Sequence, residues 1–303
     1  MKHRQFIISG AAFLVCLAAY LGGPSLLDWT QSAWRESRSP GKHHLVPILC
    51  FHNLDGKGVY SISRHRFRRY LETIKQEGIQ VVPLKTVLEH SRKNRLFRKP
   101  TMAITIDDDF KNIVRVAAPL LREYGYPATL FVYTKDISRS PRGGMSWDDL
   151  RRLHAEGFDI QNHSHTHTRF HHPRNEEPMD DYRNRLRKEI EESRTVLQKN
   201  IPGLKIYAFA YPMGYYSEYL RNRLFESGHK LLLTVDANPV NISKPFTGTF
   251  DRYTIQRKKY IRSPEAMFRL QLSYAKRIYK PEQETVQRSK GRKVEGSGDL
   301  TVQ

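Results

Sequence analysis

Short apolar runs alternate with amphipathic segments along most of this chain, and this alternation restricts the folds that it can adopt. We expect strands at residues 45–51, 79–82, 102–106, 128–133, 158–161, 207–210 and 231–235. We expect helices at residues 64–78, 84–92, 114–124, 147–156, 182–199 and 218–227. Such alternation is typical of α/β folds with a parallel sheet, either a barrel or a doubly wound sheet. In both folds the functional groups gather at the carboxyl ends of the strands.

The two ends of the chain differ in composition from the middle. Residues 1–27 begin with a basic cluster and continue into an uncharged apolar stretch, which predicts an export signal or a membrane anchor. Residues 28–43 predict a linker, residues 44–279 predict one catalytic domain, and residues 280–303 predict a polar, disordered tail. The basic flank predicts that the domain lies outside the cytoplasm, in the periplasm, at the cell surface or in the medium. The sequence is compatible both with cleavage of residues 1–27 and with their retention as an anchor in the cytoplasmic membrane.

The bulk composition narrows the classes of protein further. A formal net charge of +20 is typical of nucleic-acid binding, but export and the spread of Lys and Arg along the chain argue against a nucleic-acid partner. Attraction to anionic lipid or envelope polymers and simple solvation of helix faces both stay open as reasons for the charge. The chain has only two cysteines, Cys16 and Cys50, which excludes a disulfide framework and a cysteine-based zinc site.

Polar motifs close two of the expected strands. Asp107, Asp108 and Asp109 follow one strand, and His163 and His167 follow another. Histidines four residues apart can share an ion on one side of a single turn, and carboxylates at a strand end supply anionic ligands. Two imidazoles and one carboxylate leave coordination positions open for water, as in a hydrolytic metal site. The sequence therefore predicts one such site, with helix capping by the aspartates and an incidental histidine turn as the alternatives.

Three motifs resemble those of the polysaccharide deacetylase family, whose members have a NodB-like homology domain. The family's Thr-Phe-Asp-Asp-Gly corresponds to residues 105–109, its His-Ser/Thr-x-x-His to residues 163–167, and its Arg-x-Pro-Tyr-Gly region to residues 209–214. The resemblance implies a distorted (β/α) barrel with fewer than eight repeats. It also implies an enzyme that removes N-acetyl groups from glycans with a divalent metal.

The resemblance assigns roles to four of these residues. It implies that Asp108, His163 and His167 hold the metal, with zinc expected and cobalt, nickel or iron as alternatives. It implies that Asp107 is the general base, which takes a proton from water as the water attacks the acetamide carbonyl. His165 lies between the two outer histidines and is expected to be a spectator.

The remaining roles fall on residues outside the two main motifs. A backbone N–H near Met213 is expected to stabilise the oxyanion, and Tyr211 is expected to contact the sugar. The family's usual Leu-x-His near the C-terminus is missing, and His229 in a helix-to-strand turn is expected to lie at the opposite end of the fold. His52, which ends the first expected strand, is therefore the candidate acid that protonates the leaving amine.

Two residues depart from the family pattern. Asp109 replaces a glycine and adds a third carboxylate, so that Asp108 and Asp109 both stay open as the ligand. Ala210 stands where many members have an arginine that steadies the base. Ala-Tyr-Pro-x-Gly and an opening strand like residues 46–52 resemble the subgroup that acts on poly-β-1,6-N-acetylglucosamine.

The sequence thus predicts an exported, metal-dependent N-deacetylase that acts on an N-acetylglucosamine polymer at the cell envelope, with poly-β-1,6-N-acetylglucosamine as the leading substrate. Peptidoglycan and chitin-like oligomers follow as substrates. An O-acetyl polysaccharide esterase is an alternative, because the same metal and base can cleave an ester. A membrane-tethered glycan-binding protein that has lost turnover is the alternative outside enzymology.

Overall fold

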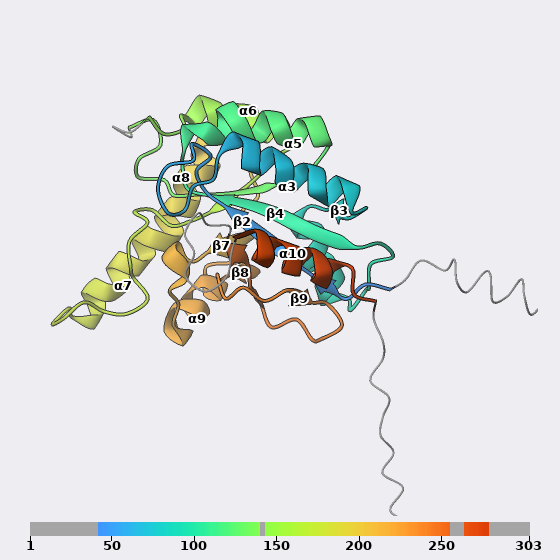
Figure 1. Cartoon of the computed structure of the whole chain (residues 1–303). Helices are drawn as coiled ribbons and strands as arrows, with labels where there is room; N and C mark the ends of the chain where they lie inside the picture. The colour runs from blue at the N-terminus through green and yellow to red at the C-terminus, as the bar shows by residue number, and fades with distance from the viewer. Residues whose placement is uncertain (1–41, 140–142, 255–263, 279–303) are drawn as a thin grey trace, which may run out of the picture.

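Parallel strands form the centre of the protein (Figure 1). A computed structural model describes residues 42–139, 143–254 and 264–278, so the predicted export segment, most of the linker and the predicted tail lie outside the described residues. Within these ranges one nine-stranded sheet has the order β10-β8-β7-β6-β5-β4-β2-β11, with β3 beside the start of β4. The strands of this sheet are β2 (Ile48–Phe51), β3 (Gln80–Val81), β4 (Thr101–Asp107), β5 (Thr129–Val132), β6 (Asp159–Asn162), β7 (Ala208–Ala210), β8 (Leu231–Leu233), β10 (Thr249–Phe250) and β11 (Tyr253–Thr254). A separate antiparallel pair joins β1 (Leu45–Val46) to β9 (Val240–Asn241).

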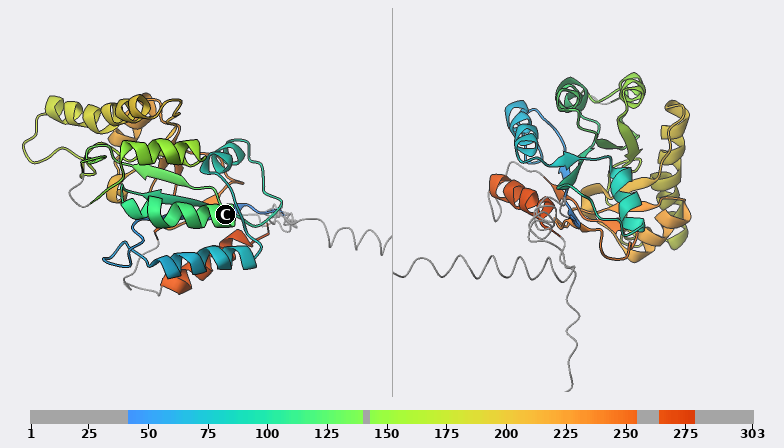
Figure 2. Two further views of the ribbon diagram at one scale, coloured as in Figure 1. Left: turned by 90° about the horizontal axis from the view of Figure 1, so that it is seen from above. Right: turned by 90° about the vertical axis from the view of Figure 1, so that its right-hand side faces the viewer.

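Helices pack around the curled sheet, most of them on its outer face, whereas the helix at Leu84–Arg92 packs against strand residues that face the inside of the curl (Figure 2). They are α3 (Arg64–Gln76), α4 (Leu84–Arg92), α5 (Ala118–Tyr124), α6 (Trp147–Ala155), α7 (Met179–Arg187), α8 (Ser193–Asn200), α9 (Glu218–Glu226) and α10 (Pro264–Ala275). Two π-helical segments, η1 (Ile113–Ala117) and η2 (Lys188–Glu192), and one 3₁₀ turn, η3 (Pro212–Gly214), complete the described elements. The predicted distorted (β/α) barrel with fewer than eight repeats is confirmed.

Local sequence signals fix several of the helix starts. Ser63, Ser146 and Ser217 each precede a helix, and each hydroxyl accepts a hydrogen bond from a backbone N–H three residues later. Ser146 and Asp149 form a reciprocal capping box. Such caps satisfy backbone donors that the first turn of a helix leaves free.

Strand alternation decides which side chains face the interior of the barrel. Ile48 and Ala103 belong to the core cluster inside the curl, whereas Leu49 and Ile104 belong to the cluster under the outer helices. Because successive side chains of a strand point to opposite faces, the residues two and four positions after Ile48 and Ala103 also point inward. The sequence therefore directs Asp107 into the barrel at the end of β4.

The structure differs from the predicted elements in three places. The expected helix at 182–199 is interrupted by η2, and the expected helix at 114–124 begins with η1. The segment after β8 contains β9, β10, β11 and α10, none of which the apolar pattern predicted. These late strands are only two residues long, too short for a periodic signal.

Candidate metal centre

The predicted site residues lie around one pocket at the carboxyl ends of the barrel strands. Every residue to which the sequence assigned a catalytic, metal-binding or substrate-binding role lines its wall. The lining residues are His52, Tyr60, Asp107, Asp108, His163, His167, Tyr211, Met213, Gly214, Val235 and Ala237. Stretches of sequence that are far apart along the chain thus form a single site.

Asp108, His163 and His167 form the group that suits a metal ion. Their ligand atoms lie within 4.8 Å of one another. Oδ1 of Asp108 is 3.4 Å from Nε2 of His167 and 3.9 Å from Nε2 of His163. Nδ1 of His163 donates a hydrogen bond to the carbonyl of Ala210 at 2.8 Å. This bond fixes the tautomer of His163, so that the lone pair of Nε2 faces the group.

The surroundings of this group fit a divalent cation. Oδ1 of Asp108 is buried and has no hydrogen-bond partner among the described residues, which is unfavourable for a carboxylate oxygen unless a cation neutralises it. Burial, together with the neighbouring carboxylates, raises the pKa of Asp108 to about 6. Burial lowers the pKa of His163 to about 3 and also lowers the pKa of His167. Both histidines are therefore neutral at pH 7, which is the form that binds metals.

The two histidines lie on an irregular loop. β6 ends at Asn162, and the chain continues as an irregular loop in which Ser164 has φ 76° and His167 has φ 55°. These left-handed conformations are rare for residues other than glycine and persist where surrounding contacts enforce them. The loop brings the imidazole rings of His163 and His167 to a centroid separation of 4.9 Å.

Asp107 is paired with an arginine that the sequence reasoning missed. Nη1 and Nη2 of Arg252 donate to Oδ1 and Oδ2 of Asp107 at 2.7 and 2.8 Å. Nε of Arg252 donates to the carbonyl of Thr234 at 3.1 Å, and the guanidinium lies over the ring of Phe131. Both charged side chains are almost fully buried. Burial alone would raise the pKa of Asp107, but the charge and hydrogen bonds of Arg252 hold it well below its usual range.

Arg252 pairs with Asp107 although position 210 is an alanine. The guanidinium reaches Asp107 from the segment between β10 and β11, which follows the motif region in sequence. The chain contains 51 Lys and Arg residues, and no local sequence pattern marks Arg252 as the one that pairs with Asp107. The parallel pairings of β10 with β8 and of β11 with β2, on either side of Arg252, bring this segment into the barrel.

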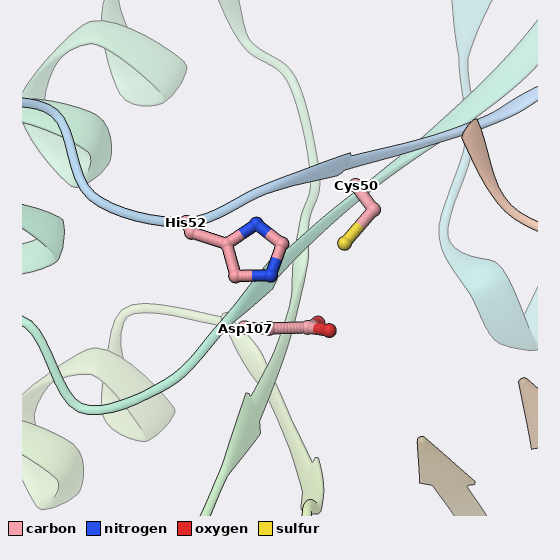
Figure 3. Close-up of side chains that lie close together, drawn as sticks. All are labelled: Cys50, His52 and Asp107. Atoms are coloured by element: carbon pink, nitrogen blue, oxygen red, sulfur yellow. The ribbon is translucent and has the colours of Figure 1, made fainter. Parts of the chain in front are cut away.

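His52 and Cys50 approach Asp107 from the neighbouring strand, as Figure 3 shows. The ligand atoms of Cys50, His52 and Asp107 also lie within 4.8 Å of one another. Arg252 already occupies both oxygens of Asp107, and burial strongly raises the pKa of the Cys50 thiol. This second group is therefore a poor divalent-ion site. Nδ1 of His52 is buried without a partner in the described part of the chain, so the imidazole is available to a bound molecule.

Asp109 does not contribute a third carboxylate to the pocket, contrary to the sequence prediction. Its side chain is 4% exposed, is absent from the pocket wall, and accepts a hydrogen bond from the hydroxyl of Tyr133 at 2.9 Å. Its backbone carbonyl accepts from the N–H of Met145 at 2.7 Å. Asp109 therefore lies outside the group formed by Asp108, His163 and His167. Oδ1 of Asp108 faces the two histidines.

The third motif supplies the opposite wall of the pocket. Tyr211 is 1% exposed, and its hydroxyl is buried without a hydrogen-bond partner among the described residues. Met213 has φ 57°, and the following Gly214 has φ 77°. A Cβ atom at Gly214 would lie 2.3 Å from Cγ2 of Val235, so only glycine fits against this part of the wall.

The other histidines near the motifs lie outside the pocket wall. Nδ1 of His165 lies 2.8 Å from the hydroxyl of Thr134, which agrees with the expected spectator role. His229 precedes β8 and is buried beneath the ring of Phe209, at the amino end of its strand as predicted. Burial lowers the pKa of His229 to about 4.

Comparisons with known proteins agree with this architecture. Residues 94–232 match the family profile described as polysaccharide deacetylase. A poly-beta-1,6-N-acetyl-D-glucosamine N-deacetylase of Staphylococcus aureus is 26% identical over 189 residues, which cover 54% of this chain and 63% of that protein. The chain spans between 47% and 63% of the lengths of the first curated relatives that it matches.

Solved structures match the described fold over most of its length. IcaB from Ammonifex degensii has a TM-score of 0.63 at 20% identity, and the match covers 77% of this chain and 98% of that chain. The Streptococcus pyogenes deacetylase PplD in complex with acetate has a TM-score of 0.63 at 21% identity, with 76% and 98% covered. At such identities the structural likeness establishes the fold.

Proposed function

We propose that this chain is a metal-dependent hydrolase that removes N-acetyl groups from an N-acetylglucosamine polymer, as its match to the polysaccharide deacetylase profile over residues 94–232 suggests. One observation carries the proposal: a single pocket joins a cation-binding group to a carboxylate and an imidazole suited to proton transfer. We favour poly-β-1,6-N-acetylglucosamine as the substrate, because the matched Staphylococcus aureus protein is named for that activity.

Asp108, His163 and His167 would hold the metal. Three protein ligands leave positions open, which distinguishes a catalytic ion from a structural one. A bound divalent ion would act as a Lewis acid toward the acetamide carbonyl and toward water. We favour zinc, and cobalt, nickel or iron suit the same set of oxygen and imidazole ligands.

Asp107 and His52 have complementary roles in proton transfer. Asp107 stays ionised beside Arg252, so its carboxylate accepts a proton from the water that attacks the acetamide carbon. His52 directly follows the neighbouring strand β2 and lines the pocket, with Nδ1 unpartnered among the described residues, and it donates a proton to the nitrogen as the carbon–nitrogen bond breaks. Acetate and a free sugar amine are the products.

Backbone and phenol groups on the opposite wall bind the sugar and the developing oxyanion. We assign the backbone N–H of Met213 to the oxyanion, because a preorganised donor there stabilises the charge that develops on the carbonyl oxygen. The buried hydroxyl of Tyr211 lacks a partner within the described ranges and is a donor for the substrate. Tyr60 lies beside His52 with ring centroids 5.4 Å apart and is 55% exposed, so its ring is accessible to a sugar.

Acetate release from defined glycans, with and without a chelator, tests the proposal. The panel contains β-1,6-linked and β-1,4-linked N-acetylglucosamine oligomers and acetylated xylan. We expect chelator-sensitive release from the β-1,6-linked oligomer. Release only from acetylated xylan would establish an esterase, and no release from any glycan by the metal-loaded protein would establish a binding protein.

We further propose that the domain acts outside the cytoplasm and that residues 1–27 direct its export. No helix within residues 42–139, 143–254 and 264–278 has the length and apolar content needed to cross a membrane. A reporter that works only outside the cytoplasm, fused after residue 43, should be active. An inactive but intact fusion would contradict export.

A further inference from the structure

The loop that carries both histidine ligands has a strained shape that needs support. We call residues 163–167 the ligand loop. Ser164 and His167 both have positive φ, a conformation that is unfavourable for residues other than glycine unless their surroundings enforce it. Because the loop determines how far His167 lies from His163, whatever enforces its shape also determines the ligand geometry.

One side of the ligand loop is held by backbone contacts. The N–H groups of Thr134 and Lys135 donate to the carbonyls of Ser164 and His165 at 3.2 and 2.9 Å. These bonds continue the parallel pairing of β5 with β6 beyond the ends of the strands. Within the loop region, the N–H of Ser164 donates to Oδ1 of Asn162 at 2.9 Å and the N–H of His167 donates to the hydroxyl of Ser164 at 3.1 Å. The N–H groups of His165 and Thr166 are left to be satisfied from the other side.

The carboxylate of Glu189 forms hydrogen bonds to the other side of the ligand loop. Oε2 of Glu189 accepts hydrogen bonds from the N–H groups of His165 and Thr166 at 3.0 and 2.9 Å, and Oε1 accepts from the hydroxyl of Thr166 at 2.5 Å. The side chain is buried, with the residue 3% exposed. All three bonds come from the segment that joins the two histidine ligands. Hydrogen bonds to a buried charged acceptor are among the stronger ones in proteins.

The π-helical segment η2 places Glu189 at the loop. Glu189 and Ile190 are both buried there, and the hydroxyl of Ser193 donates to the carbonyl of Glu189 at 2.7 Å. Asn162, at the end of β6, donates to the carbonyl of Ile190 at 3.2 Å. π-helical segments of this kind occur often at functional sites, because they re-aim side chains within a helix. The interruption of the predicted helix therefore coincides with a contact to the ligand loop.

We propose that Glu189 is a positioning residue for the metal centre. Its carboxylate accepts hydrogen bonds from the middle of the ligand loop and thereby fixes the position of His167 relative to His163 and Asp108. The inference rests on the proposed metal centre but concerns a residue that touches neither the metal nor the substrate. It predicts that Glu189 controls metal affinity separately from its effect on folding stability.

The test measures the zinc affinity of the purified full chain by competition with a chromophoric chelator, using Zn²⁺ alone as the probe. The affinity that His163→Ala removes defines the site. Glu189→Met removes the acceptors at similar size and should weaken zinc binding about 10- to 100-fold, as changes to groups that orient ligands do. Glu189→Gln keeps an oxygen for the two N–H groups and should bind zinc more like the wild type than like Glu189→Met.

Gln161 provides a matched control. Its buried Oε1 accepts from two consecutive N–H groups, those of Tyr207 and Ala208, both at 2.9 Å, but it does not contact the ligand loop. Gln161→Met should lower folding stability and leave zinc affinity unchanged. Equal zinc affinity in Glu189→Met and the wild type, or equal weakening in both methionine variants, would overturn the proposal.

A second variant keeps the test decisive if Glu189→Met does not fold. Thr166→Val removes the bond to Oε1 and the exposed hydrogen bond between the hydroxyls of Thr166 and Thr168, and keeps both N–H bonds to Oε2. It should weaken zinc binding by a smaller factor than Glu189→Met, with stability little changed. An unchanged affinity in Thr166→Val would then count against the proposal. A wild-type protein without a zinc site that depends on His163 would instead refute the proposed metal centre, so the two failures are distinguishable.

Discussion

Replacing Arg252 with methionine should destabilise the protein by about 3–5 kcal/mol, because it leaves the carboxylate of Asp107 buried without its partner charge. The guanidinium and the carboxylate form two parallel hydrogen bonds, and neither side chain is more than 3% exposed. Methionine fills part of the same volume, so most of the loss comes from the unpaired charge. Urea unfolding of the metal-free full chain at pH 7 measures the difference.

The pH dependence identifies the cause of this loss. In the wild type the pKa of Asp107 is depressed in the folded state, so the unfolded chain takes up the proton first and stability falls below about pH 4. Without Arg252, burial raises the pKa of Asp107, and the folded state takes up the proton first. Acid then stabilises the variant, so the stability difference between the two proteins should shrink as the pH falls.

An exposed pair provides the control. Arg68 also donates two hydrogen bonds to one carboxylate, that of Glu123, but both side chains are at least 38% exposed. Water already solvates these charges, so Arg68→Met should change stability far less than Arg252→Met. Similar losses in the two variants, or a loss in Arg252→Met that does not depend on pH, would refute the role assigned to the buried pair.

Three further predictions concern the residues of the pocket. His163→Ala and His167→Ala should each lose bound metal in elemental analysis of the purified protein, and unchanged metal content in both would exclude the proposed ligand set. Asp107→Asn should keep the metal and lose about 10²- to 10⁴-fold in turnover, the usual contribution of a positioned base, whereas activity within a few fold of the wild type would reject that role. His52→Ala should keep the metal, lose most turnover and flatten the alkaline side of the pH–rate profile, while His229→Ala, which changes a residue outside the pocket wall, should retain its turnover per folded molecule. A large loss of turnover in folded His229→Ala would reverse the assignment of the acid.

The sequence predicted the central strands because their apolar runs are continuous and end in polar motifs. β4 is buried at all seven positions, and α4 begins and ends where its spacing predicts. Strand periodicity also determined that Asp107 and His52 face the same interior, since each follows its strand's inward-facing positions. The pocket could be predicted from these residues because parallel strands bring their carboxyl ends to one edge.

The tertiary structure decided the features that depend on contacts between distant segments. Arg252 reaches Asp107 across 145 residues of sequence, and a two-residue strand gives no periodic signal for the segment that carries it. The histidine spacing predicted that both rings can face one side of a turn, but it did not predict that Ser164 and His167 have positive φ in a loop held by Thr134, Lys135 and Glu189. The sequence alone determines which side chains point into the barrel, because side-chain direction along a strand is a local property. Only the packed structure decides which charges are paired and which loop shape persists, because a buried ion pair and a strained loop both depend on groups brought together by the fold.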